Sequence, residues 1–136
     1  MLFRSGWLVE ASAAEGDIAT TRRYAARVLR RAHEGERLGE AVTCRALARI
    51  AAARDDFAAS QRWLRRADKS AELRGSPREA ALNQTVRGEI LARQGQTEAA
   101  CRTMREAATQ LNALGMHWHA AQATRRLEPT ASLSRS

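Results

Sequence analysis

Residues 76–96 read SPREAALNQTVRGEILARQGQ, and this stretch decides the fold class. Ser76, Pro77 and Glu79 together form a helix start: a serine N-cap, a proline at the first helical position and an acid at the third. Gly95 stands where a helix commonly ends in a left-handed turn. The stretch therefore predicts a helix over residues 77–94, then a turn and a second helix.

The same kind of break occurs three times along the chain. Gly16-Asp17, Asp55-Asp56 and Gly95-Gln96 are short polar interruptions that recur with a period of 39–40. Amphipathic stretches flank each break, at residues 7–15, 18–33, 41–54, 57–73, 77–94 and 97–114. A period of this length is typical of helical repeat proteins. We therefore expect three helical hairpins, at about 3–35, 37–74 and 76–114, in one repeat domain spanning residues 1–128.

Residues typical of helix starts and helix ends support these hairpin boundaries. Asp17 and Asp56 are expected to cap the second helix of their hairpins, and Gly75 and Gly115 to end helices. A last, capping helix is expected at about 116–128. The final residues, 129–136, are small and polar, which favours a disordered tail.

The composition favours packed helices over sheet. The chain has 136 residues, with 44% apolar residues but only 4% aromatic ones. Runs such as 51–53 consist of alanine, the best helix former. Neither of the two prolines interrupts a predicted helix. We expect an all-α protein. No apolar run approaches a membrane span, and two cysteines fit a reducing cytoplasmic setting.

The repeats carry a recognisable pattern of side-chain size. The motif of the tetratricopeptide repeat has a large then a small residue in the first helix, and small, large and small residues in the second. The second hairpin supplies Leu47, Ala48, Ser60, Leu64 and Ala67, and the third supplies Gly88, Ala100, Met104 and Ala107, with Arg87 at the large position of its first helix. The first hairpin supplies Leu8, while Val9, Thr21, Ala25 and Val28 match the motif less well. The chain thus resembles tetratricopeptide repeats. Its longer period is similar to that of tetratricopeptide-like regions in MalT-type and LuxR-type bacterial regulators and in ATPase- or cyclase-associated proteins. The resemblance implies an α-solenoid of about three hairpins.

The resemblance also implies a binding face. First helices line the concave side in this family, where the 39–40 period places Glu10, Arg45, Arg49, Glu89 and Arg93. We call these five residues the first-helix face. An arginine can hold a carboxylate through two hydrogen bonds. We therefore expect a protein-interaction module, the C-terminal part of a larger bacterial signalling or regulatory protein, that binds a protein, a peptide or its own upstream domains. The alternatives are simple pairing of these arginines with the two glutamates and a purely intramolecular spacer.

Second helices would carry rows of basic residues on the convex side. The rows contain Arg23, Arg62 and Arg102; Arg27 and Arg66; and Arg30 and Lys69. The formal net charge of +8 raises the prospect of an anionic partner. However, Lys69 is the only lysine among 23 basic residues, a bias that a GC-rich coding sequence would produce. A solvated surface is the favoured interpretation, and nucleic acid remains the less favoured alternative.

Candidates for chemistry are poor, so we expect no catalysis, no cofactor and no metal. His117 and His119 are two residues apart, which points them to different faces of a helix. Cys44 and Cys101 occupy non-equivalent repeat positions and have no histidine at a ligand spacing. The three tryptophans, at 7, 63 and 118, are expected to pack between helices. Trp118 could instead be an exposed binding residue.

Overall fold

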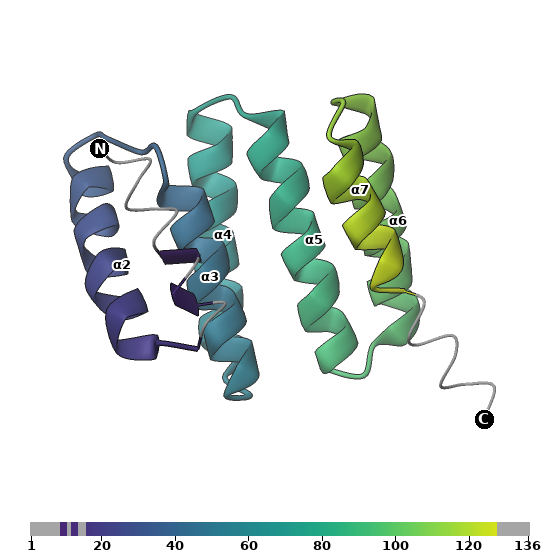
Figure 1. The fold of residues 1–136 in the computed structure, drawn as a ribbon, viewed down its shortest axis with the longest axis horizontal. Helices are drawn as coiled ribbons and strands as arrows, with labels where there is room; N and C mark the ends of the chain where they lie inside the picture. The colour runs from purple at the N-terminus through teal and green to yellow at the C-terminus, as the bar shows by residue number, and fades with distance from the viewer. Residues whose placement is uncertain (1–8, 11, 14–15, 128–136) are drawn as a thin grey trace. The chain divides into compact units, whose positions relative to one another are not determined.

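A computed structural model describes residues 9–10, 12–13 and 16–127. These residues form helices and connecting turns without any strand, so the expected all-α class is confirmed (Figure 1). The helices are α2 (Ile18–His33), α3 (Glu40–Ala53), α4 (Phe57–Leu73), α5 (Pro77–Arg93), α6 (Thr97–Ala113) and α7 (His117–Arg125). The first helix of the first hairpin falls largely outside the described residues, and the expected tail at 129–136 lies wholly outside them.

The chain divides into two compact units, residues 1–79 and 80–136. Unit 1 contains α2, α3, α4 and the first turn of α5. Unit 2 contains the rest of α5 with α6 and α7. Each unit is considered by itself below.

Six successive helix ends close with the same turn. In each, a residue with positive φ donates its N–H to the carbonyl three residues earlier, and the next residue donates to the carbonyl five residues earlier. This pair of bonds satisfies carbonyls that the helix end would leave unpaired. The residues with positive φ in these turns are Gly16, Gly35, Asp55, Gly75, Gly95 and Gly115.

These turns form two interleaved series. The turns at Gly16, Asp55 and Gly95 precede α2, α4 and α6, which we call second helices. The turns at residues 35, 75 and 115 precede α3, α5 and α7, which we call first helices. Spacings are 39 and 40 in one series and 40 and 40 in the other, so the local geometry repeats with the predicted period.

The predicted helix starts are also confirmed. Asp17 accepts a hydrogen bond from the Thr20 backbone N–H at 3.0 Å, and Asp56 accepts from Ala59 at 3.1 Å. Ser76 Oγ accepts from the Glu79 backbone N–H at 3.2 Å. Each cap satisfies one of the backbone donors that the first turn leaves unpaired.

In unit 1, small residues let α3 and α4 pack as a hairpin. Ser60 Oγ donates to the backbone oxygen of Ala48 at 2.9 Å, so the two helices approach closely at this point. Further along, Ala41, Cys44 and Ala67 form a buried cluster against which Trp63 packs. Trp63 therefore has the packing role expected from the sequence.

In unit 2, α5 approaches α6 at Gly88. A Cβ added at this glycine would lie 2.6 Å from the Met104 sulfur. Near the other end of the hairpin, Ala81 shares a cluster with Ala108 and Leu111 of α6, and Met116, Ala120 and Ala123 extend this cluster to α7. The core of unit 2 is therefore built from alanines around a few larger side chains.

The small and large positions of the repeat motif are buried in all three hairpins. The buried residues are Val9, Ala48 and Gly88 on first helices, and Thr21, Ser60, Ala100, Ala25, Leu64, Met104, Val28, Ala67 and Ala107 on second helices. Leu47 is half-buried, and Leu8 lies outside the described residues. The size pattern read from the sequence thus corresponds to the residues that the helices bury.

Candidate functional site

Arg45 of the first-helix face is part of the interior of unit 1. Its residue surface is only 5% exposed, and its Nη1 forms an ion pair with Glu79 Oε2 at 2.5 Å. Glu79 belongs to the first turn of α5, where a carboxylate also suits the helix dipole. Arg45 therefore ties α3 to the start of the next first helix and does not project as an open anchor.

Arg49 lies one turn further along α3 and is half-buried. Burial lowers the pKa of its guanidinium, and the carboxylate of Glu10 opposes this shift. Glu10 itself is exposed. Glu10 therefore interacts electrostatically with Arg49. This agrees with the alternative to partner binding, in which the arginines of this face pair with its glutamates.

In unit 2, the members of the first-helix face differ in exposure. Glu89 is half-buried and forms an ion pair with Arg126, the residue that follows α7. Arg93, in the last turn of α5, is exposed. Of the three arginines placed on this face, Arg93 is the exposed one, whereas Arg45 is buried and Arg49 is half-buried.

An acidic residue that sequence analysis missed is buried beside α4. The side chain of Glu40 is only 3% exposed, with one oxygen 3.0 Å from Arg37 and the other 3.1 Å from Arg66. Two guanidinium groups therefore compensate a carboxylate that would be costly to bury alone. Arg66, expected in a convex row, is held by this ion pair. Glu40 on α3 and Arg66 on α4 are 26 residues apart in sequence, so no local signal could have indicated this pair, whereas Arg37 is only three residues from Glu40.

Cys44 lies near this cluster and is fully buried. Burial raises the pKa of its thiol to about 12, and the Glu40 carboxylate adds to the rise while Arg66 and Arg45 oppose it. A thiol with such a pKa is not a thiolate near neutral pH. Cys44 therefore acts as a small apolar group in the core.

The remaining residues of the basic rows are exposed. They are Arg23, Arg27 and Arg30 on α2, Arg62 and Lys69 on α4, and Arg102 on α6. Helix α2 has five arginines and no acidic residue over its 16 positions. Arg23, Arg27 and Arg30 follow spacings of four and three, so they form one stripe along α2. We call these three residues the α2 arginine stripe.

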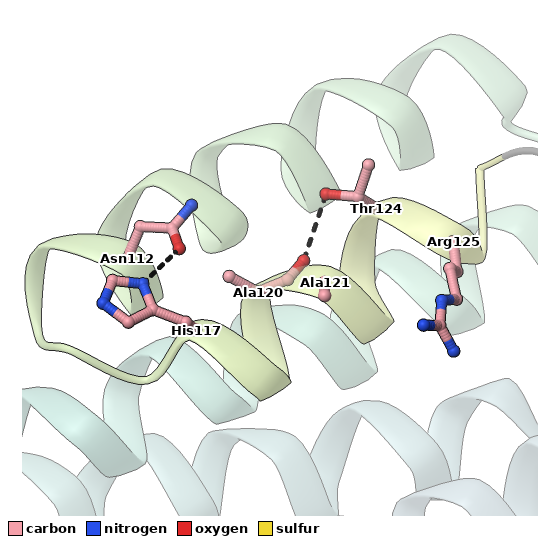
Figure 2. A pocket seen from close by; sticks show the side chains of 6 residues that line it. All are labelled: Asn112, His117, Ala120, Ala121, Thr124 and Arg125. Carbon is pink, nitrogen blue, oxygen red and sulfur yellow. Dashed lines mark hydrogen bonds between the residues drawn. The ribbon is translucent and has the colours of Figure 1, made fainter.

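A shallow pocket of about 350 Å³ lies on unit 2. Figure 2 shows its lining: Asn112 at the end of α6, and His117, Ala120, Ala121, Thr124 and Arg125 on α7. His117 Nδ1 lies 2.9 Å from Asn112 Oδ1, and Thr124 Oγ1 donates to the Ala120 carbonyl at 3.0 Å. The pocket therefore extends along one side of α7.

Trp118 is the most exposed large apolar residue of the described chain, at 68%. Its ring meets that of His119 edge to face, with the ring centroids 5.0 Å apart. Trp118 therefore does not pack between helices as expected. Its ring is exposed, as the alternative interpretation of the sequence allowed. Leu114, in the turn before α7, is also exposed at 39%.

A scan against protein-family models, curated proteins and solved structures finds no match to this chain. Within the described residues, no helix has the length and apolar character needed to cross a membrane.

Proposed function

We propose that this chain is a helical-repeat protein-interaction module, an α-solenoid of the tetratricopeptide type within a cytoplasmic bacterial signalling or regulatory protein. The observation that carries the proposal is the recurrence of one turn and one pattern of buried small residues with a period of 39–40. Repeats of this kind present side chains along helices and serve as binding scaffolds. The resemblance in motif positions supports the same assignment.

The burial of the first-helix arginines decides which of them this proposal assigns to partner binding. Arg45 is held inside unit 1 by Glu79, and Arg49 is half-buried beside Glu10. Arg93 is exposed, so it takes the place of the principal contact to an acidic group of the partner. Charge reversal at Arg45 would place two carboxylates together in the fold, and it would test stability rather than binding.

The test is a pull-down from a nuclease-treated bacterial lysate. The full chain is compared with Arg93→Glu and with Arg74→Glu, a control that changes charge equally at an exposed arginine after α4. We expect one partner to be lost with Arg93→Glu and kept with Arg74→Glu. A partner that both variants retain would remove Arg93 from the binding surface. Absence of any protein partner would contradict the proposal.

A second candidate function is nucleic-acid binding through the α2 arginine stripe. The exposure of all three stripe residues, on a helix without acidic residues, favours it. Binding to a short RNA or DNA should then weaken steeply with salt, since neutralised phosphates release counterions. Replacement of Arg23, Arg27 and Arg30 by glutamate should abolish it, whereas Arg74→Glu should leave the salt dependence nearly unchanged. Absence of binding at low salt would remove this candidate.

A further inference from the structure

The exposed basic residues of unit 1 extend from the α2 arginine stripe to α4. Both helices bury four positions that are related by the period of 39: Thr21, Ala25, Val28 and Ala32 on α2, and Ser60, Leu64, Ala67 and Ala71 on α4. The same period relates the α2 arginine stripe to Arg62, Arg66 and Lys69 of α4. Arg62 and Lys69 are exposed, whereas Arg66 is held by Glu40. Helix α4 therefore adds two exposed cations at positions equivalent to those of the stripe.

Helices α2 and α4 are neighbours in unit 1. Leu29 of α2 and Trp63 of α4 pack against the same buried cluster, the one that contains Cys44. The basic residues lie on the side of each helix opposite its shared buried positions, so they face away from this core. Glu34 and Glu72 limit the basic surface at the ends of α2 and α4. Five cations thus lie on one side of unit 1, and we call them the two-helix basic surface: Arg23, Arg27, Arg30, Arg62 and Lys69.

A coding bias towards arginine does not account for this surface, because α6 differs from α2 and α4. Arg102 of α6 occupies the position of Arg23 and Arg62, and it is exposed. Glu98 and Glu106 stand four residues before and after Arg102, where they compensate its charge. Arg23 and Arg62 have no acidic residue within four positions on either side. A bias of composition would affect all three second helices alike, whereas the uncompensated cations are on α2 and α4.

Charge, and not apolar area, dominates the two-helix basic surface. Leu73, the last residue of α4, is the only exposed large apolar residue of these two helices. A protein interface usually has aromatic or aliphatic side chains at its centre, which lose contact with water on binding. Contacts with phosphate groups need only cations, because the release of counterions drives the binding. The surface therefore fits a phosphate backbone better than it fits a protein.

We propose that the two-helix basic surface binds the sugar–phosphate backbone of a nucleic acid, without preference for base sequence. The proposal rests on nucleic-acid binding, the second candidate function above, and it adds a second helix and a mode of recognition. The aromatic residues beside the cations, Tyr24 and Trp63, are half-buried in the fold, so recognition does not depend on stacking with bases. The backbone is the part of the nucleic acid that five cations on two helices can hold.

The test measures binding of the full chain to a short duplex DNA and to a single-stranded RNA over a range of salt concentrations. Five contacted phosphates predict a slope of log affinity against log salt of about −4 to −5 for the duplex and about −3 to −4 for the single strand. Three contacts, from the α2 arginine stripe alone, would give about −3 and about −2. The slope therefore reports whether α4 takes part.

Paired substitutions identify the helix that contributes. Arg62→Gln with Lys69→Gln should weaken binding to the duplex about tenfold at low salt and reduce the size of the slope by about 2. Arg102→Gln with Arg105→Gln removes the same charge from two exposed arginines of α6 and should leave the slope unchanged. Arg62→Lys should bind like the native chain, because a backbone contact needs charge and not a two-pronged hydrogen bond.

Four outcomes would overturn the proposal. A duplex slope of about −3 that Arg62→Gln with Lys69→Gln leaves unchanged would confine binding to the α2 arginine stripe, and the second candidate function would stand. No binding at low salt would remove that function and this proposal together, while the Arg93→Glu pull-down still tests the protein-interaction function. A strong preference for one base sequence would contradict recognition of the backbone. A protein that the nuclease-treated pull-down loses with Arg62→Gln and Lys69→Gln, without any binding of nucleic acid, would make an acidic protein the occupant.

Discussion

Met104 lies directly against the backbone of Gly88, so that no side chain fits between α5 and α6 at this point. The Met104 sulfur would be 2.6 Å, and its Cγ 2.7 Å, from a Cβ built on Gly88. Such a contact is far below van der Waals distance, and Met104 is only 3% exposed. The glycine therefore sets how closely the two helices approach.

Gly88→Ala should lower the free energy of unfolding. Alanine gains about 0.5–1 kcal/mol of helix propensity, but overpacking costs about 1–3 kcal/mol, so we expect a net loss of about 1–2 kcal/mol. Urea denaturation measures the change. In a Met104→Ala background the same substitution should cost nothing or stabilise, because the clashing side chain is gone. An equal loss in both backgrounds would show that Met104 is not the cause.

Ser70→Ala and Ser60→Ala should have opposite effects on stability. Both serines are fully buried on α4, but Ser70 Oγ has no hydrogen-bond partner among the described residues, whereas Ser60 Oγ donates to Ala48. Removing an unsatisfied hydroxyl should raise the free energy of unfolding by about 0.5–1 kcal/mol, and removing a satisfied one should lower it by about 1 kcal/mol. The two changes alter the same atoms in one helix, so each controls for the other. Effects of the same sign would contradict the assigned hydrogen bonding.

Cys44 and Cys101 should differ in reactivity with a thiol reagent. The pKa of the Cys44 thiol is raised to about 12 by burial, while Cys101 is half-buried on α6. We expect the folded chain to show one reacting thiol near pH 8, retained in Cys44→Ser and absent in Cys101→Ser. Both thiols should react in denaturant. Fast reaction of Cys44 in the folded Cys101→Ser variant would show that α3 and α4 open readily.

Asp17 should make stability depend on pH in the acid range. The hydrogen bonds from Thr20 lower the pKa of its carboxyl below 3.8 in the folded chain. A carboxyl whose folded pKa is lowered stabilises the fold above the unfolded pKa, and this contribution is lost as the pH falls through the folded pKa. Asp17→Asn keeps an oxygen at the cap but cannot ionise.

The measurement is thermal unfolding of both chains between about pH 6 and about pH 2. The advantage of the native chain over Asp17→Asn should be constant at the upper end of this range and shrink below about pH 4. A difference that does not change with pH would mean that the ionised carboxylate is no better a cap than the amide.

Local features of the fold could be predicted because they depend on neighbouring residues. The predicted and observed limits of the helix at 18–33 coincide, as do those of the helix at 57–73. Asp17, Asp56 and Ser76 cap as expected, because a cap needs only a short polar side chain within one turn of free N–H groups. The turn glycines at 75, 95 and 115 are equally local.

The roles of charged residues could not be predicted in the same way. The sequence places Arg45 on a face open to a partner, but its carboxylate is Glu79, 34 residues away on the next first helix. Helical periodicity gives the side of a helix on which an arginine lies. Helical periodicity does not give the conformation of a long, flexible side chain, and it does not give the residue with which that side chain pairs. Glu40 was missed for the same reason, since exposed and buried acids look alike in a sequence.

The common turn at Gly35, Gly75 and Gly115 also bears on how such a chain can change length. The segment 36–75 is one full period, and it begins and ends at equivalent points of two turns that have the same closing hydrogen bonds. Duplicating or deleting this segment in the gene would join the end of a second helix to the start of a first helix through a turn of the kind that the chain already contains. New hairpins therefore need no new kind of turn, and a chain of this kind gains or loses surface in steps of one hairpin.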